Sequence, residues 1–270
     1  MTERLVLSEL REPGIALITL NRPDQLNAWG ADMSAAFFTA IDAAIADAAV
    51  RVIVVTGAGK GFCAGASMDA LNEIRANPSA GAGPATGERR VTDLASLAKP
   101  VIAAINGAVA GIGFSMSLFC DLRFTTTTAK FTTSFARRGL IAEYGSSWML
   151  PRLVGVARAM DLLLSGRVIT GAEAAAMGLV NAALEPEALL DHVLTYAADL
   201  CVNGCPASWA TMKQQVLHDA VRSLDEATTD ALALMNVSVT KDDFQEGVQS
   251  FLDRRPPAFA PYPGRDQQRT

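Results

Sequence analysis

Two glycine-rich stretches carry the groups in this chain that are best suited to binding a negatively charged oxygen. GAGKGFCAG (Gly57–Gly65) and NGAVAGIG (Asn106–Gly113) each follow an apolar run, and each is followed by residues with helical spacing. A strand-to-helix turn exposes backbone N–H groups at the start of the helix, where the helix dipole favours negative charge. We expect the two loops to meet at one edge of a sheet and to bind an anion or a polarised oxygen.

Neither stretch fits a nucleotide-binding motif. The P-loop pattern fails because Lys60 is followed by Gly61 rather than by Ser or Thr. The second stretch has Gly111 and Gly113 but lacks the third glycine and the acidic ribose partner, which argues against a Rossmann dehydrogenase. For either loop taken alone, glycines that merely permit a tight turn remain the alternative.

Histidine and cysteine chemistry finds little support. The two histidines, His192 and His218, each lie in an ordinary amphipathic helical stretch, which argues against a Ser-His-Asp enzyme. Two of the four cysteines lie inside apolar runs and no histidine is near a CxxC pair, so reduced buried thiols are favoured over a zinc site. We therefore expect no metal site.

Alternating strands and helices must position the two loops. The pattern predicts strands at Arg4–Leu10, Ile15–Leu20, Val52–Thr56, Pro100–Ile105, Asp121–Thr126 and Lys130–Thr132. It predicts helices at Met33–Ala49, Met68–Arg75, up to about Phe119 after the second loop, Arg158–Ser165, Gly171–Met177, Glu187–Val202, Ala207–Val221, Leu224–Val239 and Asp242–Asp253. This order indicates an α/β layered fold with ligand groups at the carboxyl ends of the strands, followed by a mostly helical region.

Composition sets limits on the possible partners. The 270 residues are 50% hydrophobic and carry a formal charge of −5, which predicts a globular chain with no basic field for nucleic acid or an anionic membrane. No apolar run reaches the roughly 18 residues of a spanning helix, and the first residues lack a signal-peptide pattern. The expectation is a cytoplasmic protein that contacts neither membrane nor nucleic acid.

Four separated motifs resemble the crotonase superfamily, also called the enoyl-CoA hydratase/isomerase family. They are ITLNRPDQLNAW (Ile18–Trp29), IVVTGAGKGFCAGASM (Ile53–Met68), KPVIAAINGAVAGIGFSMSLFCDLR (Lys99–Arg123) and SFLDRRPPAF (Ser250–Phe259). Their order and spacing cover nearly the whole chain. The resemblance implies a crotonase-like layered core built from repeated strand-strand-helix units over residues 1–200, and a helical trimerisation region over residues 201–270.

The resemblance also implies an acyl-CoA thioester site with no cofactor besides the coenzyme A of the substrate. The backbone N–H groups of Ala66 and Ile112 would form an oxyanion hole that stabilises the enolate of the thioester. Arg254 or Arg255 would supply a cation for a CoA phosphate, often to a neighbouring subunit of a homotrimer or a dimer of trimers, although a solvated helix end explains these arginines equally well. The other residues carried over to CoA or substrate binding are Arg22, Leu26, Ala28, Ala64, Ser67, Met68, Gly111 and Gly113.

The chain departs from the hydratase pattern at both acidic positions. Where hydratases have two glutamates that activate water, this sequence has Ser115 and Phe135, which we place at the substrate. A carboxylate appears instead at Glu143, in GLIAEYG, which resembles a turn that carries the base in enoyl-CoA isomerases. Burial would raise its pKa toward that of a general base, whereas pairing with Arg137 or Arg138 would lower it. A helix-capping or surface glutamate is the alternative.

These residues predict an enzyme that shifts the double bond of an enoyl-CoA, with Glu143 as the proton shuttle. Two alternatives stay open. One is a 2-enoyl-CoA hydratase, a lyase of fatty-acid β-oxidation, and the other is a non-catalytic acyl-CoA-binding relative, which the loss of both glutamates would favour.

Overall fold

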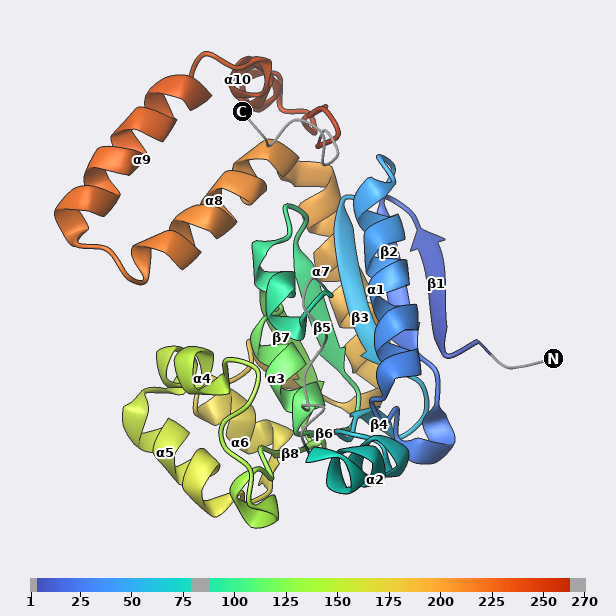
Figure 1. The fold of residues 1–270 in the computed structure, drawn as a ribbon. Helices are drawn as coiled ribbons and strands as arrows, with labels where there is room; N and C mark the ends of the chain where they lie inside the picture. Colours follow the sequence, from blue (N-terminus) through green and yellow to red (C-terminus); the bar gives the residue numbers. More distant parts are fainter. Residues whose placement is uncertain (1–3, 79–87, 263–270) are drawn as a thin grey trace.

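A computed structural model describes residues 4–78 and 88–262, and a six-stranded sheet forms the centre of this part (Figure 1). The strands follow the order β1-β2-β3-β5-β7-β10. Only the pair β1 and β2 is antiparallel among these neighbours. The strands are Val6–Arg11, Ile15–Leu20, Val52–Gly57, Val101–Ile105, Leu122–Thr126 and Ala182–Leu184. β3 and β5 are buried along their whole length, as expected for parallel strands covered on both faces.

Helices cover both faces of the large sheet. α1 (Ala31–Ala46) lies on one face and α7 (Leu189–Asn203) on the other (Figure 1). Successive side chains of β3 point to opposite faces, so Ile53 packs in the cluster that includes α1 and Val54 packs in the cluster that includes α7. The predicted α/β layered fold is confirmed.

A second, smaller sheet lies at the carboxyl end of the large one. It has the order β4-β6-β8-β9. β4, β6 and β8 each follow directly on β3, β5 and β7, and α2 (Met68–Ala76), α3 (Ile112–Leu118) and α4 (Ser146–Val154) come next in the three units. The strands of this sheet are Gly61–Cys63, Ala108–Ala110, Lys130–Thr132 and Ile169–Thr170. This succession is the strand-strand-helix repeat that the resemblance implied.

The short strands correct the sequence analysis. Both glycine-rich stretches were expected to be loops, but β4 lies inside the first and β6 inside the second. Three residues are too few to show an alternating pattern, and the surrounding glycines indicate turns. β9 and β10 were missed for the same reason.

Several predicted element ends also shift. The first strand begins at Val6 rather than Arg4. α1 ends at Ala46 rather than Ala49, because the Asp47 carboxylate accepts the N–H of Ala49 at 2.9 Å and turns the chain out of the helix. α10 spans Asp242–Asp253, as predicted.

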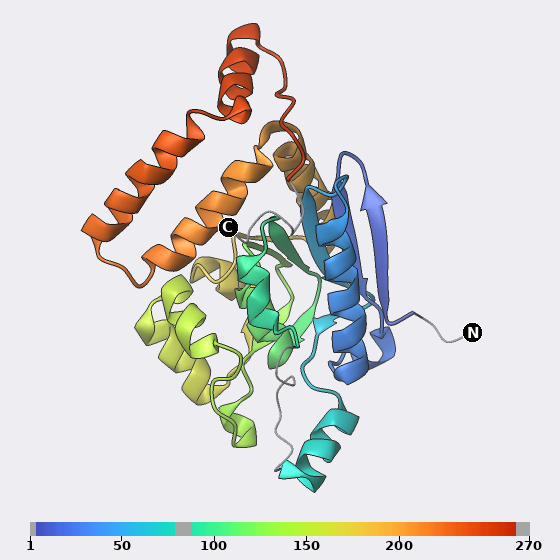
Figure 2. The ribbon, with the colours of Figure 1, turned by 45° about the horizontal axis from the view of Figure 1, so that its top comes forward.

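The last helices form an arm beyond the sheet. α7 packs on the sheet and ends at Asn203, after which α8 (Pro206–Asp219), α9 (Leu224–Ser238) and α10 extend away from it (Figures 1 and 2). α5 (Val156–Ser165) and α6 (Gly171–Ala176) lie beside the small sheet. Across residues 4–78 and 88–262, none of the helices is both long enough and apolar enough to cross a membrane.

Candidate active site

A cavity of about 650 Å³ opens where the small sheet meets α1 and α2. One wall is made by Gly65, Ala66, Gly111 and Ile112, from the loops that follow β4 and β6. The sequence analysis expected ligand groups at the carboxyl ends of the strands, and the structure places this cavity at the carboxyl ends of β4 and β6 in the small sheet.

Two glycines bring these loops into direct contact. Gly65 has φ +102° and Gly111 has φ +52°, a region that side chains disfavour. A Cβ added to Gly111 would lie 3.6 Å from the Cα of Gly65, so the two backbones meet without a side chain between them. As a result, the next residues, Ala66 and Ile112, lie on the same wall.

Both of these residues carry a backbone N–H group that is unpaired within the part of the chain that the structure describes. The backbone N–H of Trp29 donates to Gly65 O at 2.7 Å, and the backbone N–H of Ser67 donates to Trp29 O at 2.8 Å. These two bonds form a short parallel bridge between Trp29 and Ala66, and the N–H of Ala66 points away from it. Ile112 opens α3, so its N–H has no acceptor within the helix. Neither N–H has an acceptor among the described residues. Two such donors can bind a carbonyl oxygen and stabilise negative charge on it.

The segment between β2 and α1 braces the first loop through a buried amide. The side chain of Asn27 accepts the N–H of Arg22 at 2.8 Å and donates to Ala58 O at 3.0 Å and Gly61 O at 2.7 Å. These bonds hold Leu26 and Asn27 in the left-handed region, at φ 49° and 58°. The sequence analysis missed this role of Asn27, because its acceptors Ala58 O and Gly61 O lie 31 and 34 positions further along the chain.

Glu143 lies on the loop before α4 and lines the same cavity. Burial raises the pKa of its carboxyl group. Arg137 donates instead to Ser165 O at 2.8 Å, and Arg138 donates to the hydroxyl of Ser134 at 2.6 Å. Over the described residues the Glu143 carboxylate has no ion-pair partner, so the arginine pairing left open by the sequence does not form.

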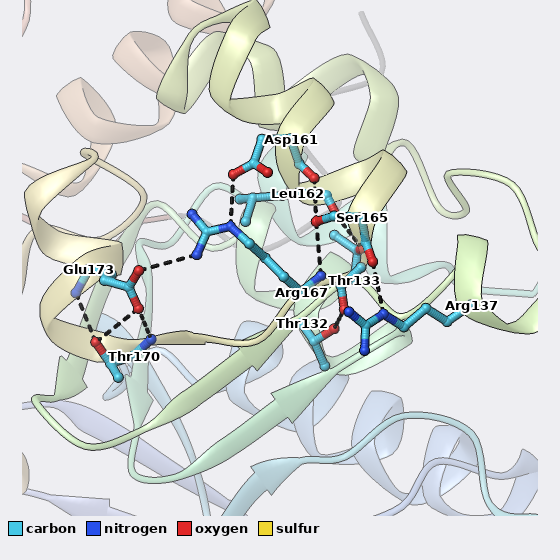
Figure 3. A network of polar contacts seen from close by, with 10 residues as sticks. Thr132, Thr133, Arg137, Asp161, Leu162, Ser165, Arg167, Thr170 and Glu173 are labelled. Atoms are coloured by element: carbon cyan, nitrogen blue, oxygen red, sulfur yellow. Dashed lines mark hydrogen bonds and ion pairs between the residues drawn. The ribbon is translucent and has the colours of Figure 1, made fainter.

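A polar network fixes the strand that leads into this loop. Thr132 and Thr133, at the end of β8, donate to Gly166 O and Leu162 O, each at 2.9 Å (Figure 3). Arg167 bridges Asp161 and Glu173 on the neighbouring helices, at 2.8 and 3.2 Å (Figure 3). The network connects β8 to α5 and α6, and the Glu143 carboxylate takes no part in its bonds.

Comparison with known proteins decides the family. A family profile described as enoyl-CoA hydratase/isomerase matches residues 11–261. The chain belongs to the enoyl-CoA hydratase/isomerase family.

Individual relatives of this family match over nearly the full length. The 1,2-epoxyphenylacetyl-CoA isomerase of Escherichia coli K12 is 33% identical, over 92% of this chain and 95% of its own length. A probable enoyl-CoA hydratase of Rhodobacter capsulatus is 34% identical, over 96% and 99%. A crystal structure of a probable enoyl-CoA hydratase/isomerase from Mycobacterium abscessus is 31% identical and superposes with a TM-score of 0.85, over 95% of this chain and 99% of that one. The chain is thus an acyl-CoA enzyme of the hydratase/isomerase type.

The two positions matched to the hydratase glutamates differ in their surroundings. Phe135 lines the cavity. Ser115 is fully buried behind the wall, and its hydroxyl lies 3.2 Å from Gly111 O and 2.7 Å from the hydroxyl of Ser146. Neither offers a carboxylate to a water molecule.

Several expected binding residues lie outside the cavity wall. Of the eight carried over to CoA or substrate, Ala64 and Gly111 line the cavity. Arg22 donates to Ala28 O at 3.4 Å and pairs with Asp32, while Leu26 O accepts the N–H of Ala64 at 3.0 Å. These contacts show that the segment carrying Arg22, Leu26 and Ala28 supports the first loop.

Three further expected residues have structural surroundings of their own. Ser67 caps α2 by accepting the N–H of Ala70 at 3.2 Å, and Met68 is exposed. A Cβ on Gly113 would lie 2.3 Å from Cys63 O, so glycine permits the contact between α3 and β4. Arg254 ends α10, at the opposite end of the molecule from α2 (Figure 1).

The cavity also has lining residues that the sequence analysis did not identify. Ser34 and Phe38 from α1 and Leu71 and Ile74 from α2 form its far side. On the near side, Tyr144 stands next to Glu143, and both burial and that carboxylate raise the pKa of its phenol. The adjacency of Tyr144 to the candidate base was the available signal.

Proposed function

We propose that this enzyme moves the double bond of an enoyl-CoA from C3 to C2, with Glu143 as the single acid-base group. Over the described residues, one cavity is lined by a partly buried carboxylate without an ion-pair partner and by two N–H donors without an acceptor, and this observation carries the proposal. The name of the Escherichia coli relative, an isomerase of a CoA thioester, agrees with this chemistry.

The proton balance needs one carboxylate and no other reactant. The N–H groups of Ala66 and Ile112 bind the thioester oxygen, and the ionised Glu143 removes a proton from C2 of the 3-enoyl thioester. The electron pair of the broken C–H bond enters the dienolate, whose negative charge rests on the bound oxygen. The protonated Glu143 then returns its proton to C4, which leaves the double bond between C2 and C3. No cofactor is needed besides the coenzyme A that the substrate carries.

Hydration of a 2-enoyl-CoA is the second candidate, because the Rhodobacter relative is named a probable hydratase. Hydration needs an activated water as well as a proton donor. Ser115 is buried and its hydroxyl is hydrogen-bonded within the protein, and Phe135 has no polar group. Glu143 would therefore have to activate the water and also donate the proton.

We further propose that the arm assembles this chain as a homotrimer or a dimer of trimers. Val216, Leu224 and Phe251, on the three helices of the arm, are 73%, 85% and 82% exposed, and packing against other copies would bury them. In such an assembly Arg254, on the same arm, would reach the CoA of a neighbouring copy. Light scattering tests the assembly, and Phe251→Glu should shift it toward monomer.

The reaction is tested by supplying 3-enoyl-CoA and 2-enoyl-CoA separately and following double-bond migration and hydration. Glu143→Gln should lower the isomerisation kcat by about 10²- to 10⁴-fold, the usual contribution of a general base. Glu73→Gln is the matched control, since Glu73 lines the far side of the cavity on α2. Isomerisation at the parental rate in Glu143→Gln would remove Glu143 from the mechanism.

The same assay separates the remaining alternatives. Hydration without migration would favour the hydratase. If neither substrate reacts while a CoA thioester still raises the Tm of the protein, the chain is a binding relative.

A further inference from the structure

Two buried hydroxyl groups connect the middle of α3 with the first residue of α4. The Oγ atoms of Ser115 and Ser146 lie 2.7 Å apart, and both residues are 0% exposed. Each end of this bond leads to one part of the candidate site. Ser115 lies on the helix that begins with Ile112, and Ser146 begins the helix that follows Glu143.

On the α3 side the bond continues to the peptide that carries a donor. Ser115 donates through Oγ to Gly111 O at 3.2 Å, and its backbone N–H donates to the same oxygen at 2.9 Å. The carbonyl of Gly111 and the N–H of Ile112 belong to one planar peptide group. Fixing the carbonyl therefore fixes the direction of the N–H.

The direction of the hydrogen bonds follows from the number of hydroxyl protons. A serine hydroxyl has one proton, and Ser115 uses it toward Gly111 O. The proton between the two hydroxyls must then come from Ser146. The chain runs from Ser146 to Ser115 to the Gly111 carbonyl, and donors on a carbonyl polarise its peptide and strengthen the opposite N–H as a donor.

On the α4 side the bond is tied to the turn that carries the base. The N–H of Ser146 donates to Glu143 O at 3.0 Å, so the residue that anchors α4 to α3 also holds the backbone of Glu143. The two serines thus link the Ile112 donor and the Glu143 base across the rear of the cavity wall.

We propose that Ser115 and Ser146 form a positioning pair, which aims the Gly111–Ile112 peptide at the thioester oxygen and sets the Glu143 turn relative to it. This rests on the proposed function. Ser115 occupies the position matched to the first hydratase glutamate, so a hydroxyl bonded within the protein stands where hydratases have an acid that faces a water.

The test compares Ser115→Ala/Ser146→Ala with Ser117→Ala. Replacing both partners of a buried hydrogen bond leaves no orphaned polar group, so the double variant should fold with a Tm near that of the parent. Ser117 is the matched control because it is a buried serine on α3 whose hydroxyl donates to Phe114 O at 2.7 Å, away from this chain of bonds. We expect kcat of the double variant to fall by about 10-fold and its KM to stay within about two-fold of the parental value. This loss is smaller than the loss in kcat of about 10²- to 10³-fold expected when a donor is deleted. Ser117→Ala should keep the parental kcat.

A spectroscopic measurement separates positioning from packing. The carbonyl stretch of a saturated acyl-CoA, bound to Glu143→Gln so that no turnover occurs, reports on the strength of the donors. Relative to Glu143→Gln alone, adding the double serine change should move this stretch back toward its value in water, and adding Ser117→Ala should leave it in place.

The possible outcomes are distinct. An unchanged kcat and an unchanged stretch in the double variant overturn the pair. Equal losses in the double variant and in Ser117→Ala also overturn it, because they indicate general packing. If Glu143→Gln is fully active, the proposed function fails while the carbonyl stretch still decides whether the pair orients the donor.

Discussion

α3 and α2 begin beside the two candidate donors, yet the fold supports them in opposite ways. α3 starts at Ile112 itself, and all seven of its residues are buried. α2 starts two residues after Ala66, and none of its nine residues is buried. Figure 2 shows α2 standing away from the sheet and from the other helices. The Ile112 donor is held by a helix that packs inside the protein. The helix that follows the Ala66 donor turns its apolar residues toward the cavity instead.

This difference indicates how one cavity can serve both chemistry and substrate selection. In the proposed reaction, proton transfer demands a fixed geometry, which α3 and the Glu143 turn would supply. An acyl chain must enter and leave, and the inner face of α2, with Ala70, Leu71 and Ile74 on the cavity, offers apolar surface to it. An acyl chain bound in the cavity would then bury the apolar side chains of α2 that the folded protein leaves partly exposed.

The largest effect should come from the same truncation made in each helix. Leu118→Ala removes a side chain that is 1% exposed in α3, and we expect it to lower the free energy of unfolding by about 2–5 kcal/mol. Leu71→Ala, at a half-buried position of α2, should cost less than about 1 kcal/mol, because little packing is lost. Urea unfolding measures both. Equal losses would contradict the contrast between the helices.

Leu71→Ala should instead be visible in substrate binding. We expect its KM to rise for a long-chain acyl-CoA more than for a four-carbon one, with kcat nearly unchanged, because the lost contact is made equally in ground and transition states. Asn72→Ala, on the exposed side of α2, is the control and should change neither constant.

Deleting each donor comes next in size. Ile112→Pro replaces the N–H by the ring Cδ at the first residue of a helix, where proline is tolerated, and Ala66→Pro replaces the N–H in the other loop. Each should lower kcat by about 10²- to 10³-fold. Ile112→Ala and Ala66→Gly keep the N–H and serve as controls. A loss at Ile112 alone would show that the hole has a single donor.

What the sequence could predict follows the same division. The motifs located Ala66, Ile112 and Glu143, which share one cavity in the structure. Their recognition rests on local patterns of glycine and acidic residues, and such patterns survive without knowledge of packing. The helical second half, including the end of α10, was predictable from apolar residues at helical spacing, which is also a local pattern.

The supporting contacts could not be predicted. The bond between Ser115 and Ser146 joins residues 31 positions apart, and the amide of Asn27 bonds to Gly61 across 34. No periodicity encodes such pairs. The exposure of α2 was equally hidden, because its apolar residues have the spacing of an ordinary packed helix.

The pH dependence should show a smaller effect. A carboxylate base works only when it is ionised, and burial raises the pKa of Glu143, so the acid limb of kcat/KM should lie above the value of about 4.3 of an exposed glutamate. The limb should persist in Glu73→Gln. A limb at the ordinary value would show that Glu143 is hydrated in the active enzyme. Because the folded pKa is the raised one, Glu143 contributes stability below its unfolded pKa that is lost as pH rises through the folded pKa.

The smallest effect, and the most direct test of the contrast, concerns amide exchange. Adding a saturated acyl-CoA such as octanoyl-CoA should slow hydrogen exchange in α2, since the ligand covers Leu71 and Ile74, which the chain itself leaves half-buried. Exchange in α3 should be slow both with and without ligand, because its helix is already enclosed. Coenzyme A without an acyl group is the control and should protect α2 less. Equal protection by both ligands would mean that the acyl chain does not contact α2. In that case only the loop after β4 would hold the Ala66 donor in place.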